Sequence, residues 1–129
     1  MITSTYQWKS FTFYETIMVN LYHTEEVYIA YMLQACKTIT MYIQWYDYER
    51  FFADQRTRDA CLMQLQHLWE CAYWLSKNHK KIILTDQKRI IWLRHFISHE
   101  YTGITYERLR DIVMNKIPTI ITELESLQK

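Results

Sequence analysis

The 129-residue sequence contains a single glycine, Gly103, and a single proline, Pro118. A β-sandwich or barrel of many short strands needs turn residues about every ten positions, so this scarcity argues against an all-β fold. It also excludes the P-loop, the Rossmann glycine motif and the nucleophile elbow, because each of these needs more than one glycine. The length fits one domain, and long helices are the favoured elements.

The sequence also lacks a strong net charge and a long apolar run. Its 15 basic and 14 acidic residues give a net charge of +1, so RNA binding would need a local basic patch. No apolar stretch reaches the roughly 18 residues of a membrane span, and the N-terminus lacks a signal-peptide pattern. Cysteines are few, and their odd number and wide spacing are typical of reduced, buried thiols: Cys36, Cys61 and Cys71. We therefore expect a cytoplasmic protein without a membrane partner.

Apolar residues recur at intervals of three and four positions in four segments, and each pattern predicts an amphipathic helix. The segments run over about 24–46, 57–76, 85–103 and 105–127. Four such helices with short connections predict an all-α fold, an antiparallel four-helix bundle. In residues 1–23, serine, threonine and aromatic residues weaken the helical pattern, so we expect an N-terminal extension docked on a bundle domain of residues 24–129.

Polar and special residues mark the ends of these predicted helices. Thr24 is a plausible N-cap of the first helix, and Thr85 or Asp86 can cap the third. Gly103 is well placed for a turn that needs positive φ. Pro118 is expected to kink or divide the last helix, because it removes a backbone donor and clashes with the preceding turn.

The richest candidate site is the sequence RHFISHEY, which carries Arg94, His95, His99 and Tyr101 at the end of the third predicted helix. A histidine can exchange protons with an RNA 2′-hydroxyl or a leaving oxygen, and an arginine can stabilise the charged phosphorane. Such chemistry requires no metal. Arg94 and His99 lie about 140° apart around an ideal helix, so one chain aims them imperfectly at one phosphate. Two such helices juxtaposed in a homodimer would complete the cleft.

Structural roles explain the same residues as well. An arginine or histidine near a helix C-terminus often only contacts the last carbonyls or the helix dipole. His95 and His99 also have the spacing of two zinc ligands, but no glutamate follows His95 and no third ligand is apparent. We expect no metal or other cofactor. The remaining histidines are expected at the surface or in helix packing: His23, His67 and His79.

Two further clusters leave their roles open. Aromatic residues could stack on bases or complete a core beside a helix end: Trp45, Tyr46, Tyr48, Phe51 and Phe52. Basic residues could meet RNA phosphates or be simply solvated: Lys77, Lys80, Lys81, Lys88 and Arg89. The start of the second long helix carries charges that suit the helix dipole and ion pairing: Arg56, Arg58 and Asp59.

Two stretches carry family-specific patterns. DYERFFADQRTRDACLMQLQHLWECAYWLS has an acidic and aromatic lead into a TRDA helix start. LRHFISHEYTGITYERLRDIVMNKIPTIITELE has an Arg-polar-x-x-x-His-x-Tyr signature, a Gly-Ile turn and a last helix with a proline. With these patterns, the segment from about Val27 to Leu127 resembles the HEPN superfamily, and specifically the HepT-like toxins encoded beside minimal nucleotidyltransferase (MNT) antitoxins.

The resemblance implies a helical bundle that dimerises through its motif helices and cleaves RNA without a metal. Arg94 and His99 fall on the catalytic pair, with His95 on the supporting polar position. Tyr101 falls on the tyrosine that the partner nucleotidyltransferase can modify with AMP, which would block the cleft by charge and bulk. The expected reaction is attack by the RNA 2′-hydroxyl, which leaves a 2′,3′-cyclic phosphate. The alternative is a non-catalytic HEPN module that docks the nucleotidyltransferase.

Overall fold

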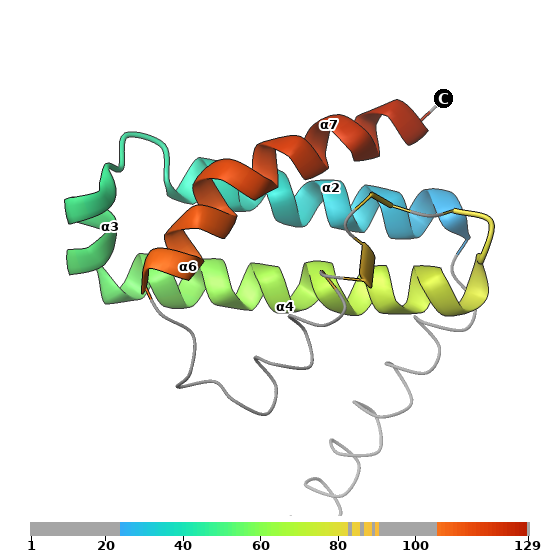
Figure 1. Cartoon of the computed structure of the whole chain (residues 1–129), viewed down its shortest axis with the longest axis horizontal. Coiled ribbons are helices and arrows are strands. Elements are labelled where there is room, and N and C mark those ends of the chain that lie inside the picture. Colours follow the sequence, from blue (N-terminus) through green and yellow to red (C-terminus); the bar gives the residue numbers. More distant parts are fainter. Residues whose placement is uncertain (1–23, 83, 86, 89, 91–105, 129) are drawn as a thin grey trace, which may run out of the picture.

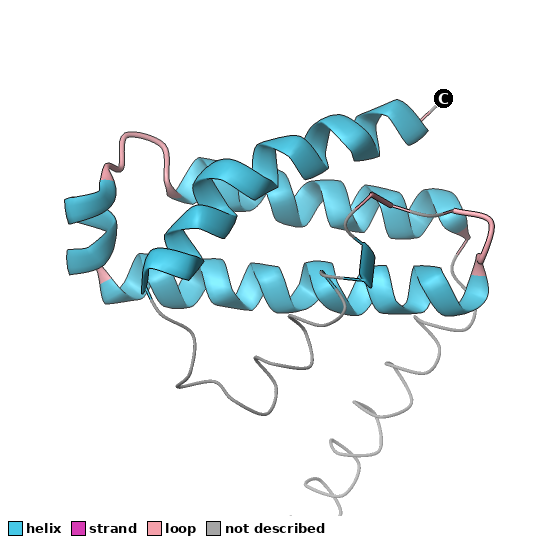
Figure 2. Cartoon of the chain, in the orientation of Figure 1, coloured by secondary structure: helices cyan, strands magenta, loops and turns pink. Residues whose placement is uncertain are grey.

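The structure is a computed structural model that describes residues 24–82, 84–85, 87–88, 90 and 106–128. Every element in these residues is helical, with no strand (Figure 2). The elements are listed in chain order: α2 (Glu25–Tyr42), α3 (Tyr48–Ala53), α4 (Gln55–Asn78), α6 (Tyr106–Asp111), the π-helical turn η2 (Ile112–Lys116) and α7 (Ile117–Leu127). The predicted all-α class is confirmed.

The bundle is built on two long antiparallel helices, α2 and α4, which pack along their length (Figure 1). The C-terminal helix α7 packs on α2, and α3 lies across one end, where α2 leads into α4. The third predicted helix falls largely in residues 91–105, outside the described residues. Residues 1–23 also lie outside them, so the proposed extension and its boundary stay predictions.

The core follows the periodic apolar positions of the sequence. Trp69, Tyr28 and Phe51 are its largest fully buried side chains, and each such burial contributes on the order of 1.5–3 kcal/mol. All the apolar residues predicted for the core face of α4 are buried: Cys61, Leu62, Leu65, Leu68, Trp69, Ala72 and Leu75. In the part of the chain that the structure describes, none of the helices is long and apolar enough to cross a bilayer.

The stretch between the first two long helices, which lies outside the predicted helical segments, contains a short helix. The first helix ends at Tyr42 rather than near Tyr46, and the stretch itself forms α3. Asp47 caps α3 by accepting a hydrogen bond from the Arg50 N–H at 2.8 Å, and Phe51 anchors α3 in the core with no exposed surface. One apolar anchor and one cap suffice for a helix too short to show a periodic pattern.

The structure confirms one predicted N-cap. Thr24 caps α2 by accepting a hydrogen bond from the Val27 N–H at 3.3 Å. The Thr85 hydroxyl donates to Glu123 Oε2 of α7 at 2.7 Å, and its role as a cap of the third helix stays a prediction. The alternative cap, Asp86, lies outside the described residues.

The last helix is interrupted next to the proline, as predicted. Pro118 has no N–H to donate, and it occupies the first turn of α7, where that loss costs least. Immediately before it, the Ile117 N–H reaches back five residues to the Ile112 carbonyl and closes the wider π turn. Pro118 therefore divides the helix into α6 and α7 without ending it, and the two parts meet at a bend (Figure 1).

Candidate functional site

The residues predicted to carry catalysis, Arg94, His95 and His99, lie outside the described residues, and so does Tyr101. The structure describes the chain on both sides of them. Ile90 precedes Arg94 by four positions in the sequence and is 4% exposed, and Leu109 in α6 is 2% exposed. The segment that carries the motif is therefore attached to the bundle core at both ends.

A hydrogen-bonded link to α7 holds the chain where it enters this segment. The backbone N–H and the hydroxyl of Thr85 both donate to Glu123 Oε2, at 2.8 and 2.7 Å. The Leu84 N–H donates to Gln87 Oε1 at 2.8 Å, and the Leu84 side chain is buried. These contacts fix the start of the third predicted helix against the C-terminal helix, seven to ten positions before Arg94.

The junction of α3 and α4 contains Asp54, a carboxylate whose pKa is strongly lowered. Asp54 accepts hydrogen bonds from the Tyr46 hydroxyl at 2.5 Å and from the Thr57 hydroxyl at 2.9 Å. It also caps α4 by accepting from the Thr57 N–H at 3.2 Å. These bonds, first that of Tyr46, lower the pKa of Asp54 to about 2. Asp54 is therefore an ionised structural cap at neutral pH, unsuited to donate a proton.

Arg58 is the one charged side chain that is buried among the described residues, at 8% exposure. Its Nη1 donates to the carbonyl of Phe51 at 3.2 Å and to that of Phe52. It thus adds a side-chain donor to carbonyls at the C-terminal end of α3, where the Phe51 carbonyl also accepts from the Asp54 N–H at 3.4 Å. The sequence places Arg58 only at a helix start, and its burial was not predicted, because it depends on α3, a helix too short to show a periodic pattern.

The residues of the aromatic cluster differ in how far they are buried. Phe51 belongs to the core, and Tyr46 is half-buried through its hydrogen bond to Asp54. In contrast, Trp45 is 84% exposed and Phe52 is 48% exposed. The core interpretation therefore holds for Phe51, whereas Trp45 and Phe52 do not complete the core.

The described histidines contact residues of a neighbouring helix, and the described lysines of the basic cluster are exposed to solvent. His67 lies beside the Tyr31 ring, at 5.9 Å, and its Nε2 is 4.0 Å from Cys71 Sγ. His79 ends α4 and lies 3.6 Å from Glu25 Oε1. His23 and Arg89 lie outside the described residues, and the four lysines of the basic cluster are exposed. Among the described residues, no three potential metal ligands converge.

All three cysteines are free and buried, as predicted. Burial raises the pKa of each thiol to about 12, so these groups are neutral and unreactive at physiological pH. They belong to the packing of α2 and α4 and supply no nucleophile.

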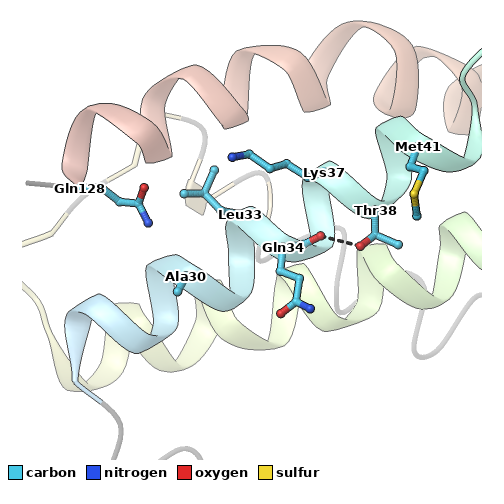
Figure 3. Close-up of a pocket in the computed structure, with 7 residues that line it drawn as sticks. All are labelled: Ala30, Leu33, Gln34, Lys37, Thr38, Met41 and Gln128. Atoms are coloured by element: carbon cyan, nitrogen blue, oxygen red, sulfur yellow. Dashed lines mark hydrogen bonds between the residues drawn. The ribbon is translucent and has the colours of Figure 1, made fainter.

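A hollow of about 430 Å³ runs along the outer face of α2 beside the end of α7 (Figure 3). Its walls are largely aliphatic and amide groups: Ala30, Leu33, Gln34, Lys37, Thr38, Met41 and Gln128. Lys37, its only charged side chain, lies 3.5 Å from Glu125 on α7. The hollow therefore lacks the acid, base or nucleophile of a reaction site.

These features define an all-α bundle whose chemistry-bearing motif sits between core-anchored segments. The Ribonuclease HepT-like family model matches residues 32–127, which include the motif. The chain belongs to this family, which is part of the HEPN superfamily.

Sequence relatives carry names that describe them as candidate RNases. One protein of Methanocaldococcus jannaschii is 29% identical over 103 residues, which cover 76% of this chain and 82% of that protein. A second from the same organism is 25% identical and covers 73% of this chain and 87% of that protein. A third, from Caldanaerobacter subterraneus subsp. tengcongensis, is 26% identical and covers 82% of this chain and 96% of that protein. No solved structure matches significantly.

Proposed function

We propose that this protein is a metal-independent endoribonuclease, the toxin of a HepT/MNT toxin–antitoxin pair in the cytoplasm. The observation that carries the proposal is the Arg94-x₄-His99 motif inside a segment that matches a ribonuclease family. A guanidinium and an imidazole supply the charge stabilisation and proton transfer that phosphodiester cleavage needs.

In the proposed reaction, the His99 imidazole removes the proton of an RNA 2′-hydroxyl. The resulting oxygen attacks the adjacent phosphorus, and the bond from phosphorus to the 5′-oxygen breaks. Arg94 stabilises the additional negative charge on the phosphorane, with support from His95. The His99 of a second copy in a homodimer protonates the departing 5′-oxygen, which leaves a 2′,3′-cyclic phosphate and a 5′-hydroxyl.

The test is cleavage of total RNA by purified protein in EDTA, beside Arg94→Ala and His99→Ala variants of equal stability. We expect the wild type to cleave and both variants to lose most of the activity, on the order of 10²-fold or more. A substrate with a 2′-deoxy sugar at the cleaved nucleotide should resist. Equal cleavage of that substrate would contradict the mechanism.

We further propose that the neighbouring nucleotidyltransferase silences the toxin by transferring AMP to the Tyr101 hydroxyl. The charge and bulk of the adenylate would exclude an RNA phosphate from the adjacent cleft. Mass spectrometry after incubation with that enzyme and ATP should locate one AMP on Tyr101. Tyr101→Phe should abolish the modification, whereas an AMP found on another residue would overturn the assignment.

The alternative function is a non-catalytic module that docks the nucleotidyltransferase through the same helix. It predicts stable complex formation by an Arg94→Ala, His99→Ala double variant and no RNA cleavage by the unmodified wild type. Co-purification of the two proteins together with the EDTA assay distinguishes the two functions.

A further inference from the structure

Trp45 has a backbone conformation that is unfavourable for a tryptophan. Its backbone has a φ of 72°, and it is the one non-glycine residue with positive φ in the described part of the chain. Glycine adopts this left-handed conformation readily, whereas a large side chain is strained in it. The Trp45 side chain is 84% exposed, so burial in this chain does not offset the strain. Strained, exposed residues of this kind concentrate at binding sites.

The turn that carries Trp45 is held in place. The Tyr46 N–H donates to the Ile43 carbonyl at 2.9 Å, which closes the turn around Trp45. The Tyr46 hydroxyl is fixed by Asp54, and the Arg50 guanidinium lies over the Tyr46 ring at 4.5 Å from its centre. The exposed Trp45 is thus adjacent in the chain to Tyr46, whose ring contacts the Arg50 guanidinium.

A second pairing of aromatic and guanidinium groups lies on α3 and α6, at the same end of the bundle (Figure 1). The Arg110 guanidinium of α6 lies 4.5 Å from the centre of the Tyr48 ring. The Tyr48 and Phe52 rings are 6.2 Å apart, and Phe52 is 48% exposed. α6 follows the motif segment in the chain, so this end adjoins the proposed catalytic region in sequence.

We propose that this end of the bundle is a subsite for single-stranded RNA, in which Trp45 stacks on a base and Arg50 and Arg110 contact phosphates. The proposal deepens the ribonuclease function and rests on RNA being the ligand. Single-stranded nucleic acid is bound by exposed aromatic faces beside cationic groups, and stacking tolerates any base. Bases in a duplex are already stacked on each other, so the subsite selects unpaired RNA.

The charges around the subsite define how it binds. Three carboxylates, Asp47, Glu49 and Asp54, lie on the same short segment as Arg50, so the local net charge is negative. Stacking, rather than phosphate neutralisation, is then the main contribution from this end. Removing Trp45 should weaken binding to a similar extent at low and at moderate salt, unlike a purely electrostatic contact.

The test is fluorescence anisotropy with a labelled 2′-O-methyl RNA of about 12 nucleotides, a length within the range of single-strand binding sites. This RNA has no free 2′-hydroxyl, so binding is measured whether or not the protein cleaves RNA. Trp45→Gly should weaken binding roughly fivefold or more. The same variant should unfold at an equal or higher urea concentration, because glycine suits the positive φ.

Matched variants distinguish the loss of base stacking from the loss of any exposed apolar side chain. Trp45→Leu should lose affinity like Trp45→Gly, whereas Trp45→Phe should keep most of it because the flat aromatic face remains. Met63→Ala removes another exposed apolar side chain, 69% exposed on α4, and should bind as the wild type does. A 2′-O-methyl duplex should compete weakly.

Three results would overturn the proposal. They are wild-type affinity in Trp45→Gly or Trp45→Leu, no binding of the single strand by the wild type, and equal binding of the duplex. A loss of association with a protein partner in Trp45→Gly, at unchanged RNA affinity, would assign this surface to that partner instead. Absence of RNA cleavage with intact Trp45-dependent binding would reject the catalytic function and leave the subsite standing.

Discussion

At the scale of single residues, Arg58 shows how one buried charge supports a short helix. Its guanidinium gives its hydrogen bonds to backbone carbonyls of α3, so the arginine of α4 joins the two helices. A cation whose donors face carbonyl oxygens avoids most of the penalty of burial. The exposed arginine two positions earlier, Arg56, offers a natural comparison.

We expect Arg58→Ala to lower the free energy of unfolding by about 2–4 kcal/mol, because buried carbonyls lose their donor and the side chain leaves a void. Urea denaturation followed by circular dichroism measures the change. Arg56→Ala should stay within about 0.5 kcal/mol of the wild type. Equal effects of the two substitutions would show that the Arg58 hydrogen bonds contribute little.

Asp54 makes the stability of this junction depend on pH. Its pKa in the folded protein is about 2, below the value of an unfolded aspartate, so the ionised form stabilises the fold. This contribution is complete above the unfolded pKa of about 4 and is lost as the pH falls toward 2. The stability difference between the wild type and Asp54→Asn should therefore shrink between these values.

The cause of the shift can be tested separately. Tyr46→Phe removes the first hydrogen bond on the carboxylate and should raise the Asp54 pKa toward its ordinary value. Carboxyl titration by NMR measures this directly. An unchanged pKa would mean that the Thr57 contacts alone hold the carboxylate ionised.

At the scale of elements, the sequence predicted those helices whose apolar pattern is long. The helices α2 and α4 were predictable because their apolar stripes repeat over several turns, and Thr24 was recognisable as a cap. α3 was not, because a six-residue helix has no period to detect and depends on contacts of Phe51 and Arg58 with other elements. The hydrogen bond of Thr85 to Glu123 was not predicted, because the two residues are distant in sequence.

In the candidate site, too, features with a local sequence pattern were predictable and the others were not. The motif residues were identifiable by their chemical types and spacing, and Pro118 correctly marked the interruption of the last helix. The left-handed turn at Trp45 could not be predicted, because tryptophan is an unfavourable choice for positive φ and nothing local indicates it. The cleft geometry involves Arg94 and His99, and in our proposal it also requires a second chain.

The cap of α2 provides a test at this scale. Thr24→Ala removes the acceptor of the Val27 N–H and should destabilise the protein by about 1 kcal/mol. Thr40→Ala, on the exposed side of the same helix, should be neutral or slightly stabilising because alanine is the better helix former. Thermal unfolding of both variants is the measurement. Equal melting temperatures for the two would show that the Thr24 cap contributes nothing.

At the scale of the whole molecule, the proposed activity requires two chains of 16.0 kDa each. We expect light scattering to give twice this mass. If each cleft takes one His99 from each chain, a heterodimer of wild-type and His99→Ala chains has a single His99 and should be as inactive as the His99→Ala homodimer. Activity of that heterodimer well above that of the His99→Ala homodimer would place a complete site within each chain.

The π turn before Pro118 changes the register of the last helix relative to an uninterrupted α-helix. A turn of this type accommodates one residue more than an α-helical turn over the same rise, so the positions before Ile112 and after Ile117 are out of phase by one. Leu109 and Leu124, on either side of the turn, both reach the core. We expect an alignment with an uninterrupted helix to need a single gap within residues 112–116, and deletion of one residue there to straighten the helix.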